Sequence, residues 1–126
     1  MSSKTVAEKI HLKKGKRVFF FNGPDNLNEL LGDIPNGVVI TKDNTADIVL
    51  AFIENYKQLE KRLYFLKGRL KPGGALWIAY HKGTSSIDTD INRDSIIEFA
   101  SGHQLKGVAM VSINGNWSAL RLKMID

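Results

Sequence analysis

The sequence predicts an α/β domain in which a mostly parallel sheet carries helices on both faces and ends in an antiparallel hairpin. Three observations predict this class. Apolar runs alternate along the chain with amphipathic segments, which is the order of repeated β-α units. The runs Arg17–Asn22, Asp47–Ile53 and Ala75–Tyr80 are apolar on both faces, which is typical of parallel strands covered on both sides. Asn114-Gly115 separates two further strand patterns and is a strong hairpin signal.

The first part of the chain predicts three strands and one short helix. The strand over Arg17–Asn22 is stopped by Gly23-Pro24. A short helix follows over Asp25–Leu31, because its leucines share one face. A second strand spans Gly37–Ile40, and a third spans Asp47–Ile53.

Glu54–Lys67 is the clearest helix pattern in the sequence. Its apolar side chains recur on one face at helical spacing: Tyr56, Leu59, Leu63 and Leu66. Gly68 ends the pattern. Lys71-Pro72-Gly73-Gly74 then predicts a turn before the strand over Ala75–Tyr80.

The last part of the chain predicts a loop, a helix and the hairpin. His81–Ile91 is polar and long for a loop in a compact domain. Asn92 has the character of an N-cap, and Gly102 ends the helix that it starts. Strands follow over Lys106–Ile113 and Trp117–Met124. The expected order is therefore β-α-β-β-α-β-α-β-β.

Length and composition fit one globular domain over residues 1–126. The chain is 43% hydrophobic and 25% charged, which argues against disorder. It has no cysteine, which excludes disulfides, thiolate metal sites and a cysteine nucleophile. Its longest apolar runs are six residues, too short for a membrane helix, and the N-terminus has no secretory-signal pattern. We therefore expect a soluble, cytoplasmic protein that does not bind membranes.

The net charge of +5 is what remains when two basic segments of +5 each are set against an acidic stretch of −5 over residues 25–54. Residues 1–17 carry six basic side chains and one acidic one, and residues 57–71 have the same balance. Residues 1–16 are expected to form a basic arm or a short helix. Solvation is the ordinary role of such segments. Nucleic-acid contact through Lys4–Arg17 and Lys57–Lys71 is a weaker alternative, and it requires both segments on one face of the molecule.

The chemistry-bearing side chains follow the strand predicted over Ala75–Tyr80. His81 ends that strand, at the edge where open α/β sheets bind ligands, although an exposed loop histidine is the simpler interpretation. Lys82, Thr84 and Ser85 give the next residues the composition of an anion-binding loop, without the order of a P-loop. The three histidines are too dispersed for a metal site. We assign no catalytic residue and no metal ligand.

Three segments resemble the class I S-adenosylmethionine-dependent methyltransferases. Arg69–Ile78, with the sequence RLKPGGALWI, is similar to the point where the fourth helix of those enzymes turns into the fifth strand. Asp47–Ile53 is similar to the strand before that helix, and Leu12–Val18 to the entry of the first strand. The resemblance implies a Rossmann-like, trimmed methyltransferase core that lacks one strand–helix unit after Ile40.

A second resemblance is closer but carries no activity. Trp77–Lys82 (WIAYHK), Thr89-Asp90 and Asn116–Arg121 resemble a family of small bacterial proteins that share a domain of unknown function with a methyltransferase-like core.

The sequence departs from the methyltransferase pattern where the cofactor would bind. The stretch Phe20–Asn26 has one glycine, no acid before it, and a proline that removes a backbone donor. The acid expected to hold ribose at the end of the second strand is replaced by Asp43, about two residues late.

These departures favour a non-catalytic module that binds a small polar or anionic ligand or a protein partner. Its cleft would lie between Asn22–Asn26, Thr41–Asp43, Ile53–Asn55 and His81–Ser86. The candidate ligand-binding residues are Asn22, Gly23, Asp25, Asp43, Glu54, His81, Lys82, Thr84 and Ser85. The alternative is an S-adenosylmethionine-dependent methyltransferase with an atypical cofactor turn. That alternative requires that Asn22–Asp25 present free backbone N–H groups to a cleft.

Overall fold

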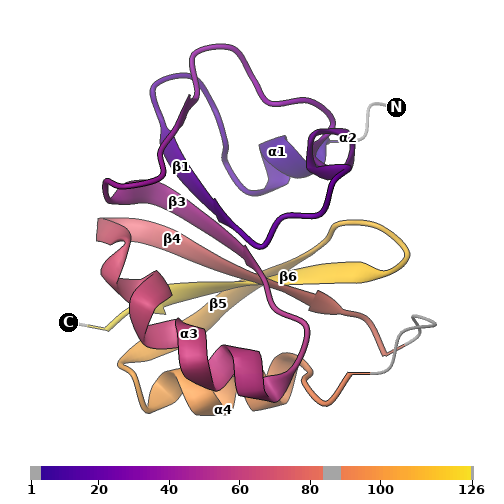
Figure 1. Ribbon diagram of the computed structural model, residues 1–126, viewed down its shortest axis with the longest axis vertical. Coiled ribbons are helices and arrows are strands. Elements are labelled where there is room, and N and C mark those ends of the chain that lie inside the picture. The colour runs from indigo at the N-terminus through magenta and orange to yellow at the C-terminus, as the bar shows by residue number, and fades with distance from the viewer. Residues whose placement is uncertain (1–3, 84–88, 126) are drawn as a thin grey trace.

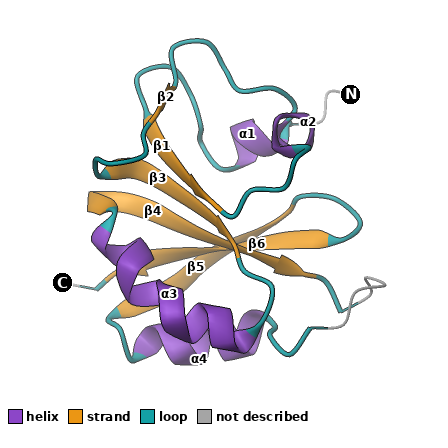
Figure 2. Ribbon diagram, in the orientation of Figure 1, coloured by secondary structure: helices purple, strands orange, loops and turns teal. Residues whose placement is uncertain are grey.

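The computed structural model describes residues 4–83 and 89–125, and these contain six strands in one sheet and four helices. The strands lie in the order β2-β1-β3-β4-β6-β5 (Figures 1 and 2). β1, β2, β3 and β4 are parallel, whereas β6 is antiparallel to both β4 and β5. The α/β class with its terminal antiparallel hairpin is confirmed. The elements are α1 (Val6–Lys9), β1 (Arg17–Phe21), α2 (Leu27–Leu31), β2 (Val39–Ile40), β3 (Ala46–Phe52), α3 (Tyr56–Gly68), β4 (Leu70–His81), α4 (Arg93–Ser101), β5 (Leu105–Ser112) and β6 (Trp117–Met124).

Helices cover the two faces of the sheet in pairs (Figure 2). On one face, Leu59, Leu63 and Leu66 of α3 pack with Ile96 and Ala100 of α4 against the central strands. On the other face, α1 and α2 pack against the same strands. The buried apolar side chains of this layer are Val6 and Ala7 of α1, Ile10 and Leu12 just after it, and Leu31 of α2.

The sheet has a switch point between β1 and β3, which are hydrogen-bonded neighbours. The chain leaves β1 toward α2 on one face and leaves β3 toward α3 on the other. Open α/β sheets bind ligands outside the carboxyl ends of the strands at such a point. The carboxyl end of the sheet between β1 and β3 is therefore the candidate ligand-binding edge.

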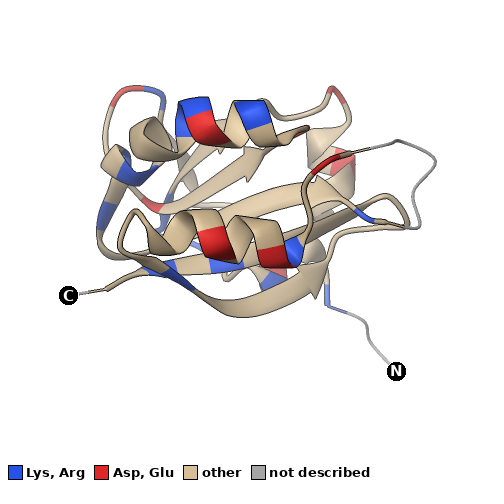
Figure 3. Ribbon diagram, turned by 90° about the horizontal axis from the view of Figure 1, so that it is seen from below, with Lys and Arg blue, Asp and Glu red and all other residues tan. Residues whose placement is uncertain are grey.

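The two basic segments lie largely on opposite faces of the sheet. α1 contributes to the core beneath one face, and α3 contributes to the core beneath the other (Figure 1). The two helices therefore present no common basic surface. The segments approach each other at the amino end of the sheet, where Lys71 pairs with Asp47 and Asp47 accepts from the N–H of Arg17. Figure 3 shows several Lys and Arg segments at the end of the molecule that carries the C-terminus.

The loop after β2 runs to the amino end of the sheet. The N–H of Thr41 donates to Val18 O at 2.8 Å, near the start of β1. The Arg69 guanidinium donates to Asn44 O at 2.9 Å and also to Lys42 O. Arg69 also lies 4.6 Å from the centre of the Phe19 ring. Because β2 has only two residues, the chain turns back to β3 before reaching the carboxyl ends of its neighbours.

Asp47 ties the amino ends of three parallel strands together. Its carboxylate accepts a hydrogen bond from the Arg17 N–H of β1 at 2.9 Å and lies 3.4 Å from Lys71 Nζ of β4. The Arg17 N–H is the larger cause, and the Lys71 charge a smaller one, of a lowered pKa for the Asp47 carboxyl. The ionised carboxylate therefore stabilises this junction.

Replacing Leu63 by alanine tests the packing of α3. Leu63 is fully buried, so Leu63→Ala should lower the free energy of unfolding by about 2–5 kcal/mol. The adjacent Tyr64 is 80% exposed, so Tyr64→Ala should change it by no more than about 0.5 kcal/mol. Urea unfolding of both variants measures this, and equal losses would contradict the orientation of the helix.

Acid titration of stability tests the role of Asp47. Because folding lowers the pKa of this carboxyl, its contribution is complete above the ordinary aspartate pKa of about 3.9. The contribution is then lost as the pH falls through the lower value of the folded state. Asp47→Asn should therefore flatten the acid limb of unfolding free energy against pH. The exposed Asp43 provides the matched control, and an Asp43→Asn variant with the same flattening would refute this assignment.

Candidate functional site

The carboxyl ends of β1, β3 and β4 lie together and are joined by hydrogen bonds. Asn22 Nδ2, just after β1, donates to Phe52 O at the end of β3 at 3.0 Å. The N–H of Ile53 donates to Ala79 O of β4 at 2.8 Å. Asn22 has a φ of 55°, a left-handed conformation that asparagine adopts more readily than most residues. The chain can therefore turn sharply out of β1 toward α2.

The turn that leaves β1 keeps backbone donors free. Within the described part of the chain, the N–H groups of Gly23 and Asp25 have no hydrogen-bond acceptor, and both residues are exposed. Pro24 has no N–H, and its carbonyl accepts from Leu27 at 3.0 Å. A Cβ on Gly23 would lie 3.0 Å from Leu27 Cδ2, so this glycine also permits close packing of α2. The free backbone donors that the methyltransferase alternative requires are therefore present in this turn.

Glu54 lies on the same edge, at the turn between β3 and α3. Its N–H donates to Gln58 Oε1 at 2.8 Å, and its carbonyl accepts from Thr89 Oγ1 at 2.9 Å. Nearby, the N–H of Tyr56 donates to Asp90 Oδ1 at 2.7 Å. These bonds fix the main chain, while the exposed Glu54 carboxylate has no partner among the described residues.

His81 is buried at the end of β4 rather than exposed in a loop. Its ring lies 3.9 Å from the Trp117 ring, centroid to centroid, at an angle of 31°. Trp117 in turn meets the Phe52 ring edge-on, at 5.0 Å. His81 Nδ1 is buried and has no partner in the described residues. Trp117 therefore covers the side chain that sequence analysis assigned to the ligand.

Lys82 is hydrogen-bonded to the hairpin of β5 and β6. Its Nζ donates to Ser112 Oγ at 2.7 Å, and its N–H donates to Asn116 O at 2.8 Å. Ser112 O also accepts from Lys9 Nζ at 3.2 Å, so α1 is tied to the same point. The other two residues of the expected anion-binding loop, Thr84 and Ser85, lie outside the described residues.

Asp43 does not join this group. The predicted cleft included Thr41–Asp43, but that segment lies at the amino end of the sheet, where Arg69 holds Lys42 O and Asn44 O. The placement was wrong because β2 is too short to carry the chain to the carboxyl edge. Of the expected residues, Asn22 and Gly23 directly follow β1, Glu54 follows β3 after one intervening residue, and His81 and Lys82 lie at the end of β4, so these five stand at the carboxyl edge of the sheet.

Sequence reasoning missed Trp117 as part of the site. Trp117 is the first residue of β6 and pairs directly with His81, the last residue of β4. The hairpin signal at Asn114-Gly115 gives the start of β6, but only the pairing register places Trp117 over His81.

The described residues contain neither a candidate metal site nor a candidate membrane-spanning helix. No group of three His, Cys, Asp or Glu side chains within residues 4–83 and 89–125 is placed to hold a metal ion. None of the helices in these ranges is long and apolar enough to span a membrane.

Known structures share this fold at low sequence identity. The complex of DhpI with SAH superposes with a TM-score of 0.66 at 8% identity, over 95% of this chain and 82% of that one. An S-adenosylmethionine-dependent methyltransferase from Clostridium acetobutylicum gives 0.57 at 10% identity, over 96% and 87%. The ribosomal protein L11 methylase from Lactobacillus delbrueckii subsp. bulgaricus gives 0.57 at 15%, over 94% and 74%. No family model and no curated protein sequence matches the chain. The methyltransferase-like core is confirmed as a fold.

Two substitutions test the packing of His81 under Trp117. Trp117→Ala uncovers His81 and Phe52 and should lower the free energy of unfolding by about 1–3 kcal/mol, less than for a fully buried tryptophan. His81→Phe replaces a ring whose buried Nδ1 has no partner, so stability should stay within about 1 kcal/mol. Urea unfolding of the two variants measures both changes in the free energy of unfolding. A larger loss for His81→Phe would mean that its nitrogen has a partner in solution.

Proposed function

We propose that this protein is an S-adenosylmethionine-dependent methyltransferase with an atypical cofactor turn. The observation that carries the proposal is the pair of free, exposed N–H groups of Gly23 and Asp25 at the switch point of the sheet. Backbone donors at this position suit the polar groups of a bound nucleoside cofactor. Solved methyltransferases with the same fold support the proposal.

The residues on this edge fit the cofactor in part. The turn Asn22–Asp25 would approach it with the free N–H groups of Gly23 and Asp25. The carboxylates of Asp25 and Glu54 are exposed, have no described partner, and would accept from hydroxyl or amino groups. When bound, S-adenosylmethionine supplies a methyl group on a positively charged sulfur, ready for transfer to a nucleophile.

A non-catalytic ligand-binding module is the second candidate, favoured by a specific departure. Neither β1 nor the end of β2 supplies an acid at the carboxyl edge, because β1 is RVFFF and Asp43 lies at the amino end. Among the described residues of this edge, the exposed carboxylates of Asp25 and Glu54 are the ones that would hold ribose instead. A module of this kind would retain the turn and its donors without the chemistry.

A calorimetric titration with S-adenosylhomocysteine tests the proposal. We expect saturable binding at micromolar concentration, with thermal stabilisation of about 2.7 kcal/mol at a hundredfold excess over Kd. Gly23→Trp places an indole over the turn and should weaken binding at least tenfold. Gly68→Trp is the matched control, because Gly68 ends α3 at the other end of the sheet with open space around its Cβ position.

The outcomes separate the two candidates. Binding that Gly23→Trp abolishes and Gly68→Trp preserves supports a cofactor site at the turn. An absence of heat and of thermal stabilisation at millimolar ligand contradicts the methyltransferase and favours the module. Equal affinity in wild type and Gly23→Trp places any binding elsewhere.

A further inference from the structure

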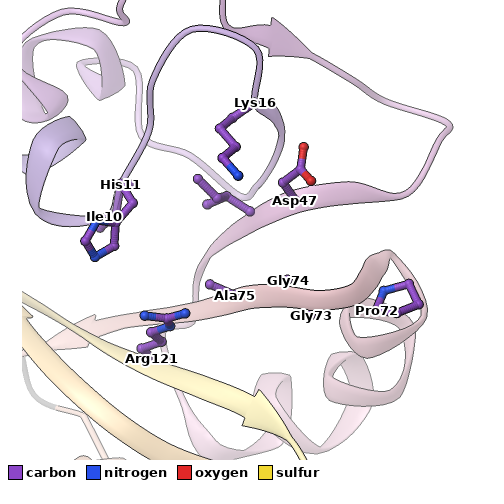
Figure 4. A pocket seen from close by; sticks show the side chains of 10 residues that line it. Ile10, His11, Lys16, Asp47, Pro72, Gly73, Gly74, Ala75 and Arg121 are labelled. Carbon is purple, nitrogen blue, oxygen red and sulfur yellow. The ribbon is translucent and has the colours of Figure 1, made fainter.

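A pocket of about 160 Å³ opens at the amino end of the sheet, on the face covered by α1. It lies at the opposite end of β1 and β3 from the proposed cofactor turn. Its polar lining includes His11, Lys16, Asp47 and Arg121, and the backbone of Gly73 and Gly74 forms part of the wall (Figure 4).

Two basic side chains in this pocket have no hydrogen-bond or ion-pair partner among the described residues. Arg121 is half-buried, and its Nε is fully buried without an acceptor in the described part of the chain. Figure 4 shows its guanidinium reaching from β6 toward His11, with Lys16 on another wall of the pocket. Lys16 has no ion pair among residues 4–83 and 89–125. A buried guanidinium N–H without an acceptor is costly, so an acceptor from outside the chain would stabilise the site.

Asp47 does not supply that acceptor. Its carboxylate already accepts from the Arg17 N–H at 2.9 Å and lies 3.4 Å from Lys71 Nζ. Its negative charge therefore interacts with both Lys71 and Lys16, and the two positive charges of Lys16 and Arg121 still exceed the single negative charge in the pocket lining. The pocket as a whole favours an anion.

His11 adds a third polar side chain to the pocket, from an unusual backbone position. It follows α1 with a φ of 64°, and the N–H of Leu12 donates to Ala7 O while that of His11 donates to Glu8 O. This is the helix-ending arrangement in which glycine is strongly preferred, because other residues are strained there. His11 therefore places an imidazole ring at a backbone position that glycine usually occupies. That ring lines the pocket opposite Arg121.

We propose that this pocket binds the phosphoryl group of a small phosphorylated molecule. A cavity near 150 Å³ accommodates about six heavy atoms, and a phosphoryl group with its bridging oxygen has five. Guanidinium, ammonium and imidazole groups are the side chains that recognise it. A second hollow of about 230 Å³ shares Pro72, Gly73 and Gly74 and is completed by Lys123 and Met124, which gives the organic part of the molecule a place to lie.

Titrations in a buffer free of phosphate and sulfate test this site, with inorganic phosphate and phenyl phosphate as probes. Both should bind saturably to the wild-type protein. Arg121→Gln should weaken both at least tenfold, the loss expected for a charged hydrogen bond. Lys57→Gln is the matched control: it removes the same charge from the exposed start of α3 and should change affinity by less than about twofold.

His11→Gly gives a readout that a merely structural role would not produce. Glycine relieves the left-handed strain, so the melting temperature should hold or rise while phosphate affinity falls. If Arg121→Gln does not fold, Lys16→Gln replaces it with the same expected loss. Tighter binding of phenyl phosphate than of phosphate identifies a phosphomonoester ligand, whereas equal binding identifies free phosphate.

Two results would overturn the proposal. One is an absence of saturable phosphate binding at about 10 mM, and the other is equal weakening in Lys57→Gln, which would mean attraction by overall charge. The test is independent of the cofactor proposal, because Gly23→Trp and added S-adenosylhomocysteine should leave phosphate affinity unchanged. A failure to bind phosphate at the amino end of the sheet therefore leaves the cofactor proposal at the carboxyl end untouched, and the reverse also holds.

Discussion

Burial of β3 and β4 on both faces is the constraint on which the rest of the structure depends. Every side chain from Ile48 to Ile53 and from Ala75 to His81 is buried. A sheet with such a centre needs a helical layer on each side, and α1–α2 and α3–α4 provide the two layers. Because the chain leaves the adjacent strands β1 and β3 toward helices on opposite faces, a switch point must form between these two strands.

Most elements could be predicted because they depend on local pattern. Amphipathic spacing identified α3, although the helix starts at Tyr56 rather than Glu54, because the Asn55 side chain accepts from the Gln58 N–H as the N-cap. The boundaries failed where strand pairing overrides turn chemistry. Pro72-Gly73-Gly74 was expected to be a turn outside the sheet, but β4 already starts at Leu70, which pairs with Ala46 across an irregular register.

The functional sites were harder to predict because they depend on contacts between distant residues. The edge of Asn22, Gly23 and Glu54 followed from the order of the strands alone. The cover of His81 by Trp117 required the register of β4 with β6. The pocket of His11 and Arg121 joins the end of the first helix to the middle of the last strand, and no local pattern in the sequence relates the two.

The position of β6 has a consequence for synthesis of the chain. β6 is the last described element, yet it lies between β4 and β5 in the sheet. Until residues 117–124 have emerged from the ribosome, β4 has an open edge and β5 has no strand to pair with. The nascent chain therefore exposes unpaired backbone on two apolar segments until β6 has emerged, and that interval is when it is most open to capture by chaperones or by other nascent chains.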